Sequence, residues 1–186
     1  ATHCVSTQGI INSLDADVDM IIHSVFKDAD GTNRFREDVA ERIGAQGAYV
    51  NPTLHVFRSK IWALERKKAE YGLSSSERSL LDEDRRQFDT RMEHCRRMID
   101  MGLKVITGSD SSWGDYMLGN TVYEVECLRI AGYSDSKALA SVTGDAASAL
   151  GIEDEVGTLQ CGKQADMIVI DGNPAQDIDN LWNVTD

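Results

Sequence analysis

The sequence predicts an α/β fold in which helices cover a parallel sheet, and two observations lead to this prediction. Short apolar runs of strand length alternate along the chain with segments of helical periodicity. Each strand–helix unit takes roughly 30 residues, which is typical of a (β/α)8 barrel or a doubly wound sheet. Both folds place their chemistry at the carboxyl ends of the strands, so residues at those ends are the candidates for function.

The expected elements follow one another in this alternating order. Pro52 stops the third apolar run, and Gly108 lets the chain turn at the end of the fourth. Ser74 and Glu77 form a capping box, which marks the start of a long helix. Strands are expected at 1–4 (in part), 18–22, 48–51 and 103–107, and helices at 8–16, 36–46, 54–71, 75–101, 120–131 and 135–150.

The pattern changes after the last of these helices. Apolar runs at 156–159 and 165–171, joined at Gly162 and Lys163, predict two strands, and a turn follows at 171–174. Two strands and a turn indicate a separate small β element. We therefore expect one domain over residues 1–151 and a second over residues 152–186.

Composition excludes several classes of partner. The net charge is −12 and the pI is near 4.7, which argues against nucleic acid or an anionic membrane as the partner. No apolar run approaches the roughly 18 residues of a membrane span. The four cysteines are widely spaced and form no C-x-x-C pair, so we expect reduced thiols and a cytoplasmic protein.

Three side chains at strand ends could bind a metal. His3 and His23 each end a predicted strand and lie 20 residues apart, the length of one β-α-β unit, and Asp110 follows the strand at 103–107. Parallel strands bring these ends to one edge of the sheet. Imidazole and carboxylate together suit zinc, iron or manganese. Taken singly, each histidine is more often structural, and Asp110 or Ser111 could instead cap a helix.

Several motifs resemble one enzyme superfamily. The histidines with their surrounding residues, the Asn-Pro-Thr-Leu segment after the third strand, the Thr-Gly-Ser-Asp-Ser segment around Asp110 and a long C-terminal stretch are similar to the amidohydrolase superfamily, in its imidazolonepropionase-like or prolidase-like branch. Ile22 departs from the pattern, which often has glutamate before the histidine. The resemblance covers nearly the whole chain and lies in residues 3–10, 18–23, 47–54, 107–111 and 156–174.

The resemblance implies a fold and a chemistry. The chain would form the C-terminal half of a metal-dependent (β/α)8 TIM barrel, strands 5–8, with part of a small β-sandwich. His3, His23 and Asp110 would bind one or two divalent ions, with zinc expected, and Asp110 would be the general base. The implied activity is hydrolysis of a carbon–nitrogen bond in a small cyclic amide, amidine or peptide-like substrate.

Three further residues are weaker candidates for contact with substrate. His55, Trp113 and Tyr116 follow strand ends on the same side of the predicted sheet. A solvent-facing loop histidine is the more common situation, and we expect it over substrate contact for His55. Trp113 and Tyr116 could pack within a loop above the barrel.

The comparison with the superfamily also raises the question of completeness. The superfamily carries a His-x-His pair on strand 1 and a lysine on strand 4, and this sequence contains neither strand. We therefore expect a C-terminal fragment that closes its barrel with the missing N-terminal half or with another copy of the chain, as a homo-oligomer. Two alternatives stay open, a half-barrel without activity on its own and an iron oxygenase with two histidines and one carboxylate.

Overall fold

The structure, a computed structural model, describes residues 1–111 and 118–185. Helices and strands alternate as the sequence predicts, and the α/β fold with its parallel sheet is confirmed. In chain order the elements are β1 (Thr2–His3), α1 (Thr7–Asp15), β2 (Met20–Ile22), α2 (Glu37–Gln46), β3 (Tyr49–Asn51), α3 (Leu54–Tyr71), α4 (Ser75–Asp100), β4 (Lys104–Val105), α5 (Val122–Ala131), α6 (Asp135–Val142), α7 (Gly144–Leu150) and the 3-10 helix η1 (Ile178–Trp182).

The strands of the described residues form one parallel sheet in the order β1-β2-β3-β4. His3 pairs with Ile22, and Ile22 pairs in turn with Asn51, so the carboxyl ends of neighbouring strands are level with one another. Each strand is only two or three residues long. The residue that follows each strand therefore lies at one shared edge of the sheet.

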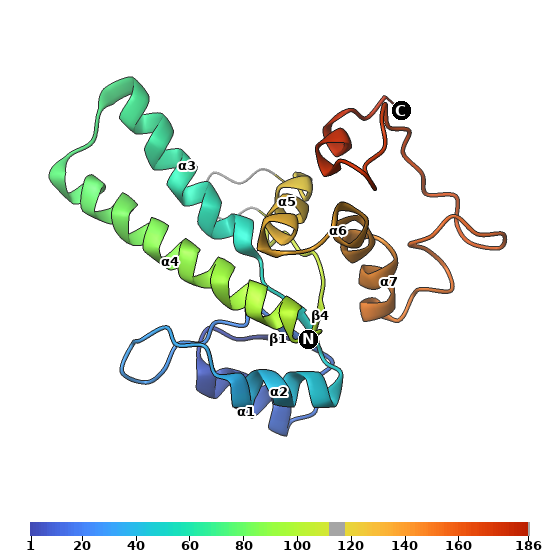
Figure 1. Ribbon diagram of the computed structural model, residues 1–186, viewed down its shortest axis with the longest axis horizontal. Coiled ribbons are helices and arrows are strands. Elements are labelled where there is room, and N and C mark those ends of the chain that lie inside the picture. Colours follow the sequence, from blue (N-terminus) through green and yellow to red (C-terminus); the bar gives the residue numbers. More distant parts are fainter. Residues whose placement is uncertain (112–117, 186) are drawn as a thin grey trace.

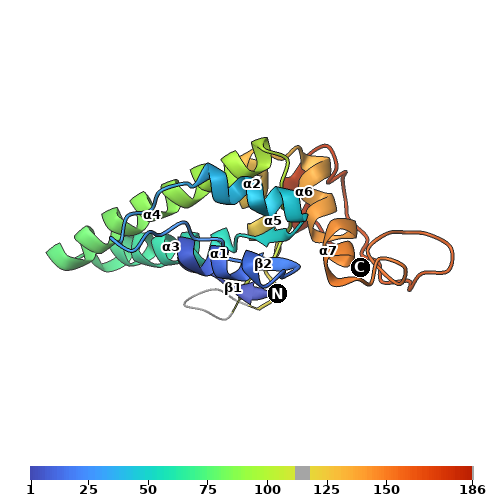
Figure 2. The same cartoon turned by 90° about the horizontal axis from the view of Figure 1, so that it is seen from below.

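The main core lies between this sheet and the helices. Ile21 and Val50 from neighbouring strands are fully buried, and the helices that cover the sheet contribute further apolar side chains. Figures 1 and 2 show α1 and α2 side by side against the strands, with α3 and α4 forming a long hairpin that projects from the body. Among the residues that the structure describes, no helix is both long and apolar enough to cross a membrane.

Two helix boundaries show why these segments fold locally as they do. The capping box is confirmed: Ser74 Oγ accepts a hydrogen bond from the Glu77 N–H at 3.3 Å, and the Glu77 carboxylate accepts one from the Ser74 N–H at 2.9 Å. Gly47 ends α2 in the left-handed conformation, with φ of 67°, which a residue without Cβ adopts at little cost.

The predicted helix at 135–150 is interrupted. Thr143 has φ of −121° and ψ of −100°, and it separates α6 from α7. Its hydroxyl donates to the Leu139 carbonyl at 2.8 Å. Such a bond from threonine to the preceding turn competes with regular helix geometry. The prediction of one continuous helix was therefore wrong.

The C-terminal segment does not form the two strands that the sequence predicts. Residues 156–159 and 165–171 form no ladder, and of the residues in these two runs only Ile170 makes a bridge, to Val184. Met167, Ile168 and Val169 are more than half exposed. A strand needs a neighbour to pair its backbone groups, and the described part of the chain offers these runs almost none. The boundary between residues 151 and 152 stays a prediction.

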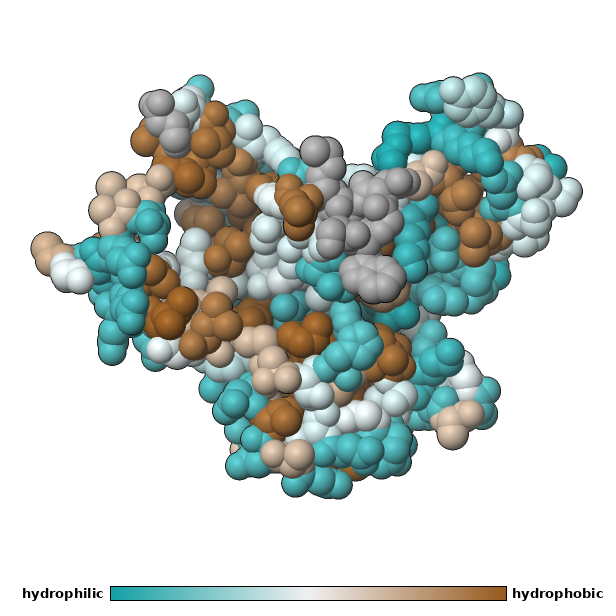
Figure 3. Space-filling view, turned by 180° about the vertical axis from the view of Figure 1, so that it is seen from behind, coloured by the Kyte–Doolittle hydropathy of each residue, from teal (hydrophilic) through white to brown (hydrophobic). Residues whose placement is uncertain are grey.

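Apolar side chains of this segment, among them Leu159, Met167 and Ile168, line an open groove together with side chains of α5 and α6. Figure 3 shows hydrophobic residues around a hollow in this lobe of the molecule. A smaller cluster of Val125, Ala138, Ile178 and Leu181 packs beside the groove and attaches η1 to the helices. The end of the C-terminal segment thus packs against α5 and α6, while Met167, Ile168 and Val169 in its middle stay exposed.

Candidate active site

His23 lies at the centre of the candidate site, and two predicted ligands lie beside it. Its Nε2 is 2.9 Å from His3 Nδ1 and 4.0 Å from the nearer carboxylate oxygen of Asp110. The two imidazole rings meet edge to face, with centroids 4.5 Å apart. His3 is the last residue of β1, His23 directly follows β2, and Asp110 lies five residues after the end of β4. The structure therefore brings together the two histidines and the aspartate that the sequence analysis proposed as metal ligands.

The other ring nitrogen of His23 has a partner that the sequence analysis missed. Its Nδ1 lies 2.6 Å from the hydroxyl of Thr53, which follows β3 and is 1% exposed. A histidine that binds a metal through Nε2 carries its proton on Nδ1 and needs an acceptor there. The Thr53 hydroxyl is placed to accept that hydrogen bond and to hold the ring.

Backbone strain is concentrated at these strand ends. His23, Ser24, Thr53 and Asp110 all have left-handed backbone conformations, with φ of 68°, 48°, 50° and 44°. Residues with a side chain adopt this conformation at a cost of about 1–3 kcal/mol each, and such strain occurs preferentially at functional sites. The conformation of Asp110 also turns its carboxylate toward His23. It caps no helix among the described residues, since α5 begins at Val122 with Thr121 as its N-cap.

The electrostatics of the site favour a neutral imidazole. Burial lowers the pKa of His23, and His3 lowers it further, while Asp110 acts in the opposite direction. A neutral imidazole has a lone pair available for a metal ion. The Asp110 side chain is 34% exposed, so its carboxylate is accessible to water.

The donor atoms suit a divalent metal, although their present spacing does not yet form a coordination sphere. Among residues 1–111 and 118–185, no three His, Cys, Asp or Glu side chains are arranged as a ready metal site. Two nitrogens on one tetrahedral zinc lie roughly 3.3 Å apart, whereas His3 and His23 share a hydrogen bond at 2.9 Å. Binding thus requires loss of the shared proton and a small separation of the rings. Two imidazoles and one carboxylate fit zinc chemically.

Asn51, the last residue of β3, and Gly108, which follows β4, pack closely against each other beside His23. The Asn51 carbonyl accepts a hydrogen bond from the His23 N–H at 2.7 Å. Its side-chain Oδ1 is buried and has no hydrogen-bond partner. A Cβ on Gly108 would lie 1.7 Å from Asn51 Nδ2, so the Asn51 amide fills the space that glycine leaves open. This packing explains why a glycine stands two residues before Asp110.

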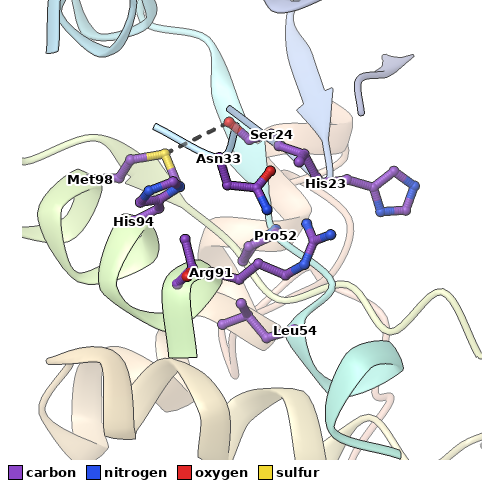
Figure 4. A pocket seen from close by; sticks show the side chains of 10 residues that line it. His23, Ser24, Asn33, Pro52, Leu54, Arg91, His94 and Met98 are labelled. Atoms are coloured by element: carbon purple, nitrogen blue, oxygen red, sulfur yellow. Dashed lines mark hydrogen bonds between the residues drawn. The ribbon is translucent and has the colours of Figure 1, made fainter. Parts of the chain in front are cut away.

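A small cavity, of about 10 Å³, lies behind the site between α4 and the ends of β2 and β3. In Figure 4, Arg91 extends into it from α4, whereas the His23 ring points away from it. Arg91 Nε and Asn33 Oδ1 are buried without hydrogen-bond partners. Burial lowers the pKa of Arg91 to about 10, and its guanidinium lies 3.7 Å from the Phe57 ring centroid. The volume and the two unpaired groups suit one water molecule.

The structure corrects the expectation that His55 is exposed to solvent. His55 is 2% exposed, so the prediction of a solvent-facing loop histidine was wrong. It is the second residue of α3, stacks on Tyr123 with ring centroids 4.6 Å apart and accepts a hydrogen bond from Arg58 Nε at 2.9 Å. Burial lowers its pKa to about 3. Trp113 and Tyr116 lie outside the described residues, and substrate contact by all three residues stays a prediction.

Glu124 is a second residue that the sequence analysis missed. It is 0% exposed, on α5, and burial raises its pKa to about 7 against the effect of its backbone hydrogen bonds. Its carboxylate accepts hydrogen bonds from the Leu54 and His55 N–H groups at 2.8 and 2.6 Å. The only signal in the sequence was a glutamate among the apolar residues of the predicted helix at 120–131, which does not reveal its partner.

Comparisons with known proteins show what the whole chain is similar to. The chain is 40% identical over 78 residues to an imidazolonepropionase of Symbiobacterium thermophilum, covering 40% of this chain and 18% of that protein. An imidazolonepropionase of Thermoplasma volcanium is 33% identical over 84 residues, covering 45% and 20%. A crystal structure of a Xaa-Pro dipeptidase with bound methionine superimposes with a TM-score of 0.73 at 25% identity, covering 98% of this chain and 41% of the other.

The chain thus spans about two fifths of the length of that solved structure. Residues 1–185, which include the site, match the family described as the amidohydrolase family. With nearly every residue inside that match, the chain belongs to the amidohydrolase family.

Proposed function

We propose that the full-length protein carrying this chain is a metal-dependent hydrolase of carbon–nitrogen bonds, with a cyclic amide, amidine or peptide-like substrate. The observation that carries the proposal is the convergence of His3, His23 and Asp110 at one edge of the sheet. Family membership supports it, as do the names of the matched relatives. That membership favours hydrolysis over the iron oxygenase alternative.

The sheet topology supports placing these strands in a barrel. The order β1-β2-β3-β4 follows the chain without reversal. A doubly wound sheet reverses its strand order at the switch point, whereas a (β/α)8 barrel adds each strand beside the last. We therefore infer that β1–β4 correspond to strands 5–8 of a TIM barrel and that residues 152–186 contribute to a β-sandwich.

The residues present determine where a metal ion would bind. His3 and His23 would each offer an imidazole nitrogen and Asp110 a carboxylate oxygen, a donor set that suits zinc. When bound, a divalent cation supplies polarisation of the scissile carbonyl and a lower pKa for water. The Thr53 hydroxyl oxygen accepts a hydrogen bond from His23 Nδ1–H, which keeps Nε2 directed at the site.

Asp110 then performs the proton transfers. Its partly exposed carboxylate accepts a proton from the attacking water as the water oxygen bonds to the carbonyl carbon. The carbon–nitrogen bond breaks when the same carboxyl returns that proton to the leaving nitrogen. Water is thus divided between an acid product and an amine product, and Asp110 ends the cycle ionised.

The test is to remove each donor from the full-length protein. His3→Ala, His23→Ala and Asp110→Asn should lose stoichiometric metal or lower turnover on a panel of amides, and loss of the general base alone is expected to cost about 10²–10⁴-fold. Asp145→Asn is the matched control, because Asp145 pairs with Lys137 on the surface of α6 and α7 and should behave as the wild type. Unchanged metal content and turnover in all three variants would refute the assignment.

The same assays address the two alternatives. The 186-residue chain assayed alone is expected to be inactive, which agrees with the half-barrel alternative for this piece. Stoichiometric metal and turnover in it would show instead that these strands suffice. Turnover that requires dioxygen and ferrous iron would favour the oxygenase.

A further inference from the structure

Glu124 caps a helix to which it does not belong. Its Oε1 accepts the N–H of Leu54 at 2.8 Å and its Oε2 the N–H of His55 at 2.6 Å. These are the first two residues of α3, whose N–H groups have no partner within the helix. A carboxylate at this end of a helix is favoured by both hydrogen bonding and the helix dipole.

Because Glu124 accepts these hydrogen bonds, the side chain of Thr53, the N-cap residue of α3, is available for another partner. Thr53 is the N-cap of α3, yet it makes no side-chain capping hydrogen bond. Threonine at an N-cap usually accepts a hydrogen bond from one of the first N–H groups of its own helix. With Glu124 in that role, the Thr53 hydroxyl lies instead 2.6 Å from His23 Nδ1.

The conformation of Thr53 needs support from its surroundings. Its φ of 50° and ψ of 46° are unfavourable for a β-branched residue, and such a conformation persists only where neighbouring contacts enforce it. The two hydrogen bonds that the Leu54 and His55 N–H groups donate to Glu124 fix the backbone immediately after Thr53. Glu124 lies on α5, which follows β4 in the chain, and its carboxylate therefore links α5 to the start of α3.

We propose that Glu124 is a positioning residue for the site: by capping α3 from α5, it holds Thr53 against His23 and thereby directs His23 Nε2 toward His3 and Asp110. This inference rests on the proposed function, which makes His23 a metal ligand. Partners of a ligating histidine fix its tautomer and orientation, and their loss typically lowers metal affinity by about 10–100-fold.

The test measures zinc affinity in the full-length protein by competition with a chelating dye. Glu124→Gln keeps the shape of the side chain but presents an NH2 group to an N–H donor. We expect affinity to fall by about 10–100-fold, and Thr53→Val to cause a fall of similar size. The double variant should fall little further than the more affected single variant, because both changes act on one imidazole.

A spectroscopic readout reports on the imidazole itself. In the metal-free wild type, nitrogen-15 NMR of the histidines is expected to show His23 protonated at Nδ1. In Glu124→Gln the same ring should show a mixture of tautomers. An unchanged His23 spectrum together with unchanged zinc affinity would overturn the proposal.

Leu128→Ala separates positioning from general stability. Leu128 is fully buried on the same helix, in the main core. This variant should unfold at a lower temperature while its zinc affinity stays within about twofold of the wild type, since it leaves the cap intact. If Glu124→Gln shows the same pattern, Glu124 is merely structural and the proposal fails.

The test also covers a Glu124→Gln variant that does not fold and a wild type that binds no zinc. If Glu124→Gln does not fold, Glu124→Asp replaces it; this side chain is one methylene shorter and reaches only one of the two N–H groups well. Unchanged zinc affinity in the aspartate variant would also overturn the proposal. If the wild type binds no zinc, or His23→Ala keeps it, His23 is not a zinc ligand and this inference fails, while the turnover of the three donor variants decides the proposed function separately.

Discussion

A single methyl group added at Gly108 tests how closely the strand ends pack beneath the site. A Cβ there would lie 1.7 Å from Asn51 Nδ2, 2.4 Å from its Cγ and 2.5 Å from its Oδ1. All three distances are far below the roughly 3.5–4.0 Å of a favourable contact. Gly108→Ala must therefore move the whole Asn51 amide or separate β4 from β3.

The cost can be estimated from this geometry. Overpacking of a well-packed region typically costs about 1–3 kcal/mol. We expect about 2–3 kcal/mol, because the Asn51 carbonyl also accepts the His23 N–H at 2.7 Å and displacement of Asn51 disturbs that bond. The backbone of Gly108 adds nothing, since its φ is not positive. Zinc affinity should fall with stability, because His23 moves with Asn51.

Urea unfolding and zinc titration of the full-length protein provide the assay. Gly44→Ala is the matched control, because its Cβ would meet only Leu103 Cδ1 at an ordinary 3.7 Å and alanine favours its helix. Asn51→Ala combined with Gly108→Ala should recover most of the lost stability by removing the obstructing amide. The steric reasoning is refuted if Gly108→Ala unfolds like the wild type, or if the second substitution brings no recovery.

Three other expectations follow. Chelation of a metal present at 100 times its Kd should lower the free energy of unfolding by about 2.7 kcal/mol in urea, an increment that His23→Ala should lack. Burial between Phe26 and Phe35 lowers the pKa of His94 to about 4, so the unfolded chain takes up a proton that the folded chain does not between roughly pH 6.5 and 4. Stability should fall as the pH is lowered through this window, and His94→Phe should flatten the slope of unfolding free energy against pH. Ser74→Ala removes the capping box of α4 and should cost about 1 kcal/mol by thermal or urea unfolding.

Sequence patterns predicted the features that depend on neighbouring residues. The helix at Leu54–Tyr71 has the predicted bounds, and the capping box at Ser74 is present. Strand ends carrying His3, His23 and Asp110 could also be aligned, because parallel strands joined by helices bring their carboxyl ends to one edge. The core of the candidate site was therefore accessible to reasoning from sequence.

Features that depend on distant residues were missed. Thr53 was noted only as part of the Asn-Pro-Thr-Leu segment that resembles the superfamily, and only the fold places its hydroxyl on His23, 30 residues away. Glu124 meets the start of α3 across about 70 residues, and no local pattern encodes that contact. Burial of His55 depends on α5 packing over it. The strand expected at 165–171 did not form. An apolar run forms a strand only where a neighbouring backbone pairs with it, and this too depends on residues outside the run.

The left-handed residues at the strand ends have a consequence for engineering. Replacing His23, Ser24, Thr53 or Asp110 by glycine would relieve backbone strain and remove a side chain of the site or beside it at the same position. A library selected for heat resistance alone would therefore accumulate glycine substitutions at residues of the candidate site. Ranking positions by the stability gained on replacement with glycine is therefore expected to select these four residues of the candidate site or beside it, together with Asp17, which has φ of 53° and follows α1 away from the site.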